Sequence, residues 1–212
     1  MKSKFLIEKI GKYLREVSIV VIGVAITLSL SYLIANRTEK RDVALYLNAM
    51  KLEMEENIKS LDEEASYLEY WNNYGNYLSS QNKNSIPPDS IRNYGPGLST
   101  IKSTVFQTSA FEMFKTSGTM RLIDDKDLLQ SIWKAYLSLE NARHSLWFYF
   151  ENKKKQLDVE IPLILKGNSV SIPLYDFFII YNSDTHMAKN CRITSGKFKT
   201  TIEKLEKSKY FN

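Results

Sequence analysis

The chain has 212 residues, of which 43% are hydrophobic and 25% are charged. This composition excludes a disordered tail and a polytopic transporter, and it fits one membrane anchor followed by one domain large enough to bury a core. The formal charge of +5 is scattered along the chain, whereas a nucleic-acid-binding surface needs a coherent basic face, so we expect no nucleic-acid partner. The single cysteine, Cys191, excludes an intrachain disulfide and an all-cysteine metal site.

Residues 1–17 combine apolar side chains at helical spacing with five basic and two acidic residues. Such a segment lies in the headgroup layer of a membrane, with its ammonium groups towards anionic lipid. We therefore predict a basic amphipathic juxtamembrane segment, with a plain basic flank that orients insertion as the alternative. A cleaved secretory signal is disfavoured, because the apolar run that follows is longer than a signal core and Leu33 stands where a small residue is needed.

Residues 18–36 contain no charge and no proline, and no other stretch of this length lacks charge. At about 1.5 Å rise per residue, a helix of that length crosses the hydrocarbon core of a bilayer. We predict a single transmembrane helix, which makes the lipid bilayer a partner of this chain. Five Lys or Arg precede the span, and four follow it, namely Arg37, Lys40, Arg41 and Lys51. A short basic leader before a long domain favours the leader in the cytoplasm and the domain outside it.

Gly23, Thr27 and Ser31 recur every fourth residue within the predicted span. Three small residues at this spacing form one stripe on a helix, and such stripes let two helix backbones approach closely. The stripe predicts self-association of the span. The alternative is that the residues have no partner, since Gly, Ser and Thr are common in membrane helices and hydroxyl groups bond their own backbone there.

Proline is absent from residues 37–80, and apolar residues recur there at steps of three or four. They are Leu47, Met50, Met54, Ile58, Leu61, Ala65, Leu68 and Trp71. The pattern predicts an amphipathic helix, about 60 Å long and continuous with the span. Its apolar seam needs a cover, which is either the later helices of the same chain or the same helix of a second chain in a coiled coil. The methionines and aromatic residues favour the first.

Five aromatic residues gather towards the end of this helix: Tyr67, Tyr70, Trp71, Tyr74 and Tyr77. The favoured interpretation is that they pack in a core and that the loop predicted at 81–99, which is rich in Pro, Gly, Asn and Ser, only connects two helices. The alternative is that these residues and the loop line a ligand pocket.

Two further helices are predicted at about 109–117 and 125–161. Ser109 followed by Glu112 is typical of a capping box, Gly118 suits the left-handed residue that ends a helix, and Asp124 is predicted to cap the second helix. Pro162 predicts a kink or the end of that helix. Its apolar face should pack on the long helix and comprises Leu128, Leu129, Ile132, Trp133, Tyr136, Leu137, Leu139, Leu146 and Phe150.

The last part of the chain is less regular. Residues 169–181 are rich in aromatic and branched residues, which fits a strand, a buried loop or a short helix. Phe198, Ile202 and Leu205 predict a final amphipathic helix at about 196–209. The whole sequence therefore predicts a mainly α protein, in which residues 37–212 form one extramembrane α-helical bundle.

Candidate chemical groups have structural explanations. His186 and Cys191 are five residues apart, a spacing that no familiar zinc site uses, and a nucleophilic pair would need a third orienting group. His144 lies within a predicted helix. Neighbouring acids such as Asp124 and Asp125 serve helix capping and solubility. We predict no catalytic residue, no cofactor and no metal site.

One resemblance rests on the apolar run at 16–28 with its internal Gly23, the helix behind it, and the stretch 109–140. In these parts the chain resembles a family of uncharacterised bacterial single-span membrane proteins. The family pattern is an N-terminal span, a Ser-capped aromatic helix, a Ser-Gly turn, a Leu-Ile pair and a second aromatic helix. Phe111 stands where the pattern has Trp. The resemblance implies the bacterial inner membrane as the location, with no activity to carry across.

These features favour a non-enzymatic, single-pass, membrane-anchored helical protein that acts through protein–protein interaction. Its partner would be a second copy of the chain or another protein of the membrane or envelope. An extracytoplasmic sensor or ligand-binding module, which would use the aromatic pocket, is the alternative. A membrane-tethered enzyme is the second alternative, and it requires reactive residues that meet only in the folded chain.

Overall fold

The computed structural model describes residues 2–80, 104–165 and 184–211, and within these ranges it is helical and contains no strand. The mainly α fold is thereby confirmed. Its elements in chain order are α1 (Lys2–Ser80), α3 (Ser109–Thr116), the short 3-10 helix η1 (Thr119–Leu122), α4 (Lys126–Leu165) and α6 (Asp184–Lys207). The loop predicted at 81–99 and the segment at 169–181 lie outside the described residues.

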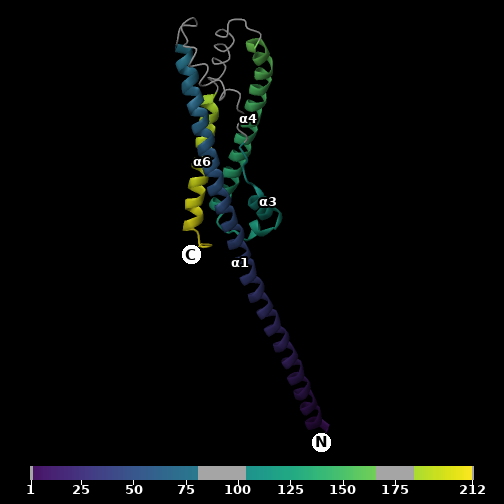
Figure 1. Ribbon diagram of the computed structural model, residues 1–212. Coiled ribbons are helices and arrows are strands. Elements are labelled where there is room, and N and C mark those ends of the chain that lie inside the picture. Colours follow the sequence, from purple (N-terminus) through teal and green to yellow (C-terminus); the bar gives the residue numbers. More distant parts are fainter. Residues whose placement is uncertain (1, 81–103, 166–183, 212) are drawn as a thin grey trace.

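Helix α1 is uninterrupted over 79 residues. At about 1.5 Å per residue it is roughly 120 Å long. Its N-terminal half stands alone in Figure 1, whereas α3, α4 and α6 gather around its second half. The prediction that the apolar span and the long amphipathic helix form one continuous helix is therefore confirmed.

The predicted apolar seam of α1 faces the interior of the bundle. Of its eight residues, seven are buried and Ile58 is partly buried against them. Val43 extends the same seam by one turn towards the span and is 1% exposed. The cover for this seam is supplied by later helices of the same chain, as the methionines and aromatic residues indicated.

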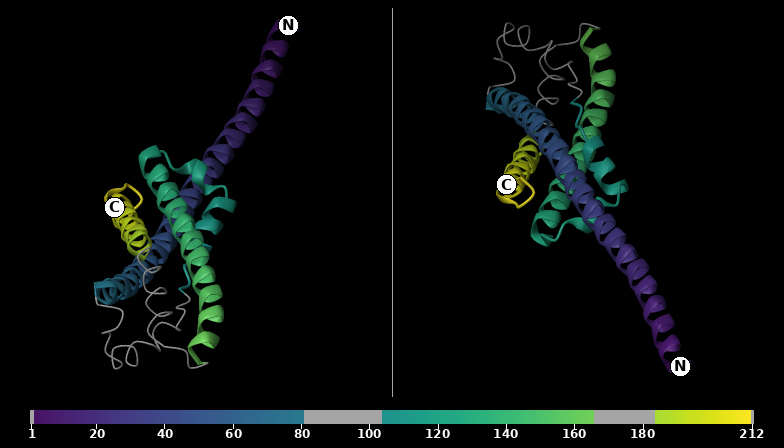
Figure 2. Two further views of the ribbon diagram at one scale, coloured as in Figure 1. Left: turned by 90° about the horizontal axis from the view of Figure 1, so that it is seen from above. Right: turned by 90° about the horizontal axis from the view of Figure 1, so that it is seen from below.

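Helix α6 packs along both α1 and α4 and joins them into one bundle, as the two views in Figure 2 show. The backbone of α4 lies closer to α6 than to α1. The buried residues of its apolar face share one hydrophobic core with the seam of the long helix, on which we predicted that face to pack. Two residues assigned to that face, Trp133 and Leu137, are 46% and 54% exposed. Residues Leu128, Ile132, Tyr136, Leu139 and Leu146 are buried as predicted.

Helix α6 begins twelve residues earlier than predicted, at Asp184 and not at 196. Its first half buries Ala188, Cys191, Thr194 and Ser195. Small and weakly polar residues at core positions produce no apolar periodicity, so the sequence pattern did not reveal this half of the helix.

The capping box predicted at the start of α3 is wrong. Ser109 is already the first helical residue, the preceding residue Thr108 makes no side-chain capping bond, and the Glu112 carboxylate pairs with Lys115 at 3.0 Å. The backbone N–H groups at this helix start donate instead to Glu53 of α1. A residue distant in sequence thus performs the capping that we assigned to a local one.

The cap of α4 is displaced by one residue from our prediction. The Asp125 carboxylate, and not that of Asp124, accepts the N–H of Leu128 at 2.9 Å. Asp124 pairs instead with Lys209 at 2.6 Å beyond the end of α6. Gly118 has the predicted left-handed conformation, with φ of 73°, and α4 continues past Pro162 to Leu165.

Candidate functional site

The apolar part of α1 that precedes the bundle is exposed on all sides. It contains an 18-residue window in which no residue is buried, and it is long and apolar enough to cross a membrane. Its exposed large apolar residues are Ile19, Val20, Val21, Ile22, Val24, Ile26, Leu28, Leu30, Leu33 and Ile34. Because these residues cover every face of the helix, the bundle does not use the segment as a core helix.

The stripe of small residues predicted in this span is also exposed. The Thr27 hydroxyl donates to the backbone carbonyl of Gly23 at 2.9 Å, and a Cβ atom added at Gly23 would meet nothing within 4 Å. Ser31, one helical turn after Thr27, is also exposed. The Thr27 bond is the one that the alternative expects, whereas the open space at Gly23 leaves room for another helix. Self-association of the stripe stays a prediction.

The aromatic residues predicted to line a pocket are divided between the core and the surface. Trp71 is 8% exposed, Tyr67 is partly buried, and Tyr70 and Tyr77 are 52% and 47% exposed. Tyr67 and Tyr70 both pack edge-on against Trp71, with ring centroids 6.1 and 5.1 Å away. The side chain of Tyr74 and the loop at 81–99 lie outside the described part of the chain, so the pocket stays a hypothesis.

Glu53 is the polar centre of the half of the bundle that lies nearer the exposed apolar segment of α1. Its carboxylate accepts the N–H of Ala110 at 2.7 Å, the N–H of Phe111 at 3.3 Å and the hydroxyl of Tyr136 at 2.6 Å. Burial, together with the bond to Glu53 and its charge, raises the pKa of Tyr136 above its ordinary value of 10.0, so the phenol stays a donor. Because its three donors belong to α3 and α4, the Glu53 carboxylate joins these helices to α1. The Phe111 ring of α3 also stacks on the Tyr136 ring of α4, with centroids 4.1 Å apart.

Two more buried polar residues of α1 hold the chain that leads into α3. The Asn57 amide donates to the carbonyl of Gln107 at 2.7 Å and accepts its N–H at 2.8 Å. The Thr104 hydroxyl donates to the Glu64 carboxylate, which is fully buried. Glu53, Asn57 and Glu64 therefore attach residues 104–111 along one side of α1.

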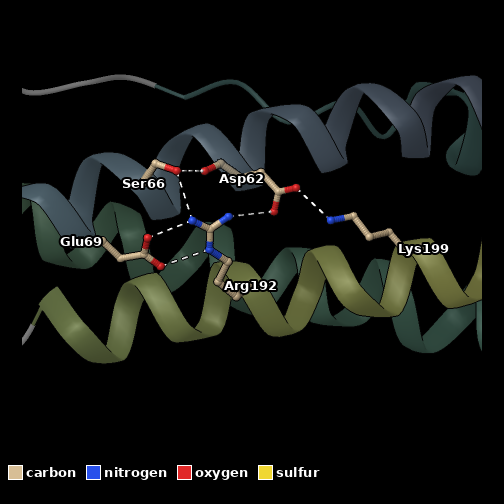
Figure 3. Close-up of polar contacts among 5 residues, drawn as sticks. All are labelled: Asp62, Ser66, Glu69, Arg192 and Lys199. Atoms are coloured by element: carbon tan, nitrogen blue, oxygen red, sulfur yellow. Dashed lines mark hydrogen bonds and ion pairs between the residues drawn. The ribbon is translucent and has the colours of Figure 1, made fainter.

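An exposed ion cluster joins α1 and α6 further from the span (Figure 3). The Arg192 guanidinium contacts both carboxylate oxygens of Glu69 at 3.1 and 2.9 Å, and it contacts Asp62 at 3.4 Å. Lys199 also pairs with Asp62, at 2.9 Å. The two helices thus present complementary charges beside their apolar contact.

This cluster lowers the pKa of both acids. Burial acts to raise the pKa of Asp62, but the hydrogen bond from Lys199 and the charges of Lys199 and Arg192 outweigh it and bring the pKa below 3.8. The hydrogen bond from Arg192 lowers the pKa of Glu69 below its ordinary value of 4.5. Both carboxylates are therefore ionised at neutral pH, and the cluster has a structural role.

The structure does not bring His186 and Cys191 together. His186 is exposed on α6, whereas Cys191 is fully buried in the core. Burial, with the charge of Glu64, raises the pKa of the Cys191 thiol to about 12, which opposes formation of a nucleophilic thiolate. Among the described residues no group of three or more His, Cys, Asp or Glu is arranged to hold a metal ion.

An apolar surface that we did not predict from the sequence lies on the outside of α1, and we call it the outer α1 face. It consists of Leu45, Ala49 and Leu52, together with Met113 of α3. Leu45, Leu52 and Met113 are 60%, 63% and 59% exposed, and a groove of about 720 Å³ runs between the two helices. The recurrence of Leu45 and Leu52 after seven residues, off the core seam, was the available signal.

A second exposed apolar surface lies on α4, and we call it the aromatic α4 face. It consists of Trp133, Leu137, Trp147 and Phe148, of which the last two are 58% and 59% exposed. A cavity of about 380 Å³ adjoins the end of this face at Trp133, between Phe111, Lys115 and Trp133. Lys115 lies 5.9 Å from the Trp133 ring centroid. Exposed aromatic residues in a row are typical of protein interaction sites.

No significant match to this chain was found among protein-family models, curated proteins or solved structures. The resemblance to bacterial single-span membrane proteins therefore stays a prediction. The candidate functional sites of the described chain are its exposed apolar surfaces: the span, the outer α1 face and the aromatic α4 face.

Proposed function

We propose that this chain is a non-enzymatic, membrane-anchored interaction protein, in which one helix is both the membrane anchor and the spine of the interacting domain. The observation that carries the proposal is the continuity of α1 from the exposed apolar segment into the core seam. A helix without interruption fixes the distance and the orientation of the bundle relative to the bilayer.

The surface of the bundle supports an interaction role. Trp133, Trp147 and Phe148 are exposed on one side of α4, although each could bury a large apolar area. Tryptophan in particular contributes strongly to protein interfaces when it is buried by a partner. Because α1 fixes the distance of the bundle from the bilayer, it also fixes the distance at which the aromatic α4 face can bind a partner in the same membrane or envelope.

For location we propose the bacterial inner membrane, with the bundle on the extracytoplasmic side. The basic leader at 1–17 carries five Lys or Arg, against four that follow the span within residues 37–51. The leader is the short side and the bundle is the long one, an arrangement that favours a cytoplasmic leader.

Alkaline carbonate extraction of membranes tests the anchor. We expect the full chain to stay in the membrane pellet and to be released by detergent, because the apolar window of α1 prefers hydrocarbon to water. A variant with Val24→Arg and Ile26→Arg should move into the soluble or aggregated fraction, since each central Arg costs about 2.5–3.5 kcal/mol on insertion. Release of the natural chain by carbonate would refute the anchor.

Reporter fusions after Phe211 test the orientation. Phe211 follows α6, which is part of the bundle, so a reporter placed there lies on the same side of the membrane as the bundle. Alkaline phosphatase should be active at this position, and a reporter that folds only in the cytoplasm should be dark. The reverse pattern would place the bundle in the cytoplasm and leave the anchor intact.

A further inference from the structure

We infer that two copies of this chain associate side by side in the membrane, in parallel and around a two-fold axis, through the outer α1 face. The inference rests on the proposed membrane anchor and names the partner of that surface. It is independent of the aromatic α4 face, which it leaves exposed.

The outer α1 face lies on the opposite side of α1 from the core. Leu45 and Leu52 are each two residues before a fully buried residue, Leu47 and Met54, and two residues correspond to about 200° around a helix. The bundle therefore cannot cover this face. Ala49 lies between the two leucines and is exposed, so a second helix can approach the backbone closely there.

The groove beside this face has the shape to receive a side chain from a second copy. It lies between Leu45 and Leu52 on α1 and Ala110 and Met113 on α3, and its volume is about 720 Å³. Under two-fold symmetry a leucine of each copy enters the groove of the other, so both grooves are filled by one arrangement.

Charged residues at the two ends of the face indicate how the copies are oriented. Arg41 and Asp42 flank the membrane-proximal end on opposite edges, since consecutive residues lie about 100° apart on a helix. At the distal end Lys59 lies on the edge of Arg41, from which it is separated by five whole turns, and Glu56 lies towards the edge of Asp42. One edge of the face thus carries Arg41 and Lys59, and the other carries Asp42 and Glu56; the exposed Glu55, beside the first edge, pairs with Lys51 of its own chain.

A parallel two-fold pair places the basic edge of each copy against the acidic edge of the other. Arg41 then faces Asp42 of the second copy, and Lys59 faces Glu56. An antiparallel pair would place Arg41 near Lys59 and Asp42 near Glu56, which repel. Within the described ranges none of these four residues forms an ion pair with its own chain, so all four are free to pair across the axis.

The membrane imposes the same parallel orientation, because all copies enter it from the same side. The small-residue stripe of the span is in register with the outer α1 face: Ser31, Thr38, Leu45 and Leu52 are separated by seven residues each, close to two helical turns. A specific interface between soluble proteins buries roughly 1,200–2,000 Å², more than four side chains provide. Contact along the span and confinement to the bilayer supply the remainder.

Disulfide cross-linking of the full chain in native membranes tests the inference. Ala49→Cys lies at the centre of the face, where two Cα atoms would come within about 7 Å, so mild oxidation should give a covalent dimer. The natural chain, whose buried Cys191 is its only thiol, and Glu203→Cys, exposed on α6, should form no covalent dimer. Cross-linking of Ala49→Cys no greater than that of Glu203→Cys overturns the inference.

Charge exchange tests the parallel arrangement. Arg41→Asp in the Ala49→Cys background should lower the dimer yield by roughly fivefold, because two ion pairs per dimer become repulsive. Adding Asp42→Arg should restore the yield, since the exchanged edges again face each other with opposite charge. A double exchange that stays as low as the single one contradicts the parallel pairing.

Carbonate extraction of the same membranes separates the two proposals. A chain that stays in the pellet but does not cross-link at Ala49→Cys refutes the two-fold contact and keeps the anchored function. A chain that carbonate releases refutes the anchor and, with it, the inference that depends on it.

Discussion

Tyr136 of α4 donates its hydroxyl proton to Glu53 of α1 at 2.6 Å, although the two residues lie 83 positions apart in the chain. Glu53 is 7% exposed and accepts two backbone N–H groups of α3 through the same carboxylate. A buried carboxylate stabilises a fold only while its hydrogen-bond donors stay in place. If the carboxylate is removed, the buried donors are left without an acceptor. This one side chain therefore helps to hold α3 on the bundle, together with the buried Phe111 and Phe114.

Glu53→Ala should lower the free energy of unfolding by about 3 kcal/mol, because it leaves the Tyr136 hydroxyl and two backbone N–H groups without their acceptor. Tyr136→Phe should cost less, about 1 kcal/mol, since the carboxylate keeps its two backbone donors. Denaturant unfolding of the full chain in detergent, followed by circular dichroism, measures both. Glu55→Ala, on the exposed side of α1, is the control, and equal stability of the two alanine variants would contradict the role of Glu53.

Asn57→Ala should release the chain that leads into α3. Asn57 is 1% exposed and makes both of its bonds with the backbone of Gln107, so its loss removes two of the contacts that hold this segment on α1. We expect chymotrypsin to cut after Phe106 at least about fivefold faster, as for a contact worth about 1 kcal/mol or more. Mass spectrometry of the fragments measures the rate.

Asn48→Ala, which removes an exposed amide from the same helix, should leave that rate unchanged. An Asn57→Ala chain that is cut no faster than Asn48→Ala would show that other contacts suffice to hold the segment.

The sequence predicted the parts of the fold that depend on apolar periodicity. The seam from Leu47 to Trp71 was found because large apolar residues recur at helical steps, and burial followed that spacing. The first half of α6 was missed because Ala188, Cys191 and Thr194 are small or weakly polar. Their burial depends on close packing of helices, which leaves no hydrophobic pattern.

The polar contacts could not be predicted in the same way. Glu53 and Asn57 read as solvated positions of a charged helix, and their partners follow 50 or more residues later. The exposed Trp133 was assigned to the core because it is large and apolar, although it lies off the face of Leu128 and Ile132. The candidate surfaces appear only once the chain is folded, since exposure depends on which helices cover which faces.

Arg192→Gln should reduce stability by about 1 kcal/mol at pH 7, a modest amount because the cluster is solvent-exposed. The pKa values of Asp62 and Glu69 are lowered in the folded chain, so their contribution is present above the ordinary values of 3.8 and 4.5. It is lost as the pH falls through the lowered folded values. The stability difference between the natural chain and Arg192→Gln should therefore be constant from pH 7 to about 5.5 and shrink at lower pH.

The free energies of unfolding of the natural chain and of Arg192→Gln, measured between pH 7 and pH 3, give this difference in stability. Lys199→Gln is a second variant that removes only one ion pair with Asp62 and should show a smaller difference. A difference that stays constant down to pH 3 would mean that Arg192 acts through packing and not through these carboxylates.

Two neighbouring residues of α4 should respond to alanine in opposite ways. Leu146 is 4% exposed and Trp147 is 58% exposed, so Leu146→Ala should lower the free energy of unfolding by about 3 kcal/mol and Trp147→Ala by less than about 0.5 kcal/mol.

A large tryptophan that contributes little to folding is free to contribute to binding. A photoreactive residue in place of Phe148 should therefore cross-link to a protein other than a second copy in intact membranes, whereas one at the exposed Lys154 should not. Cross-linking that is equal at the two positions would remove the aromatic α4 face as a docking surface, because contact would then follow exposure alone.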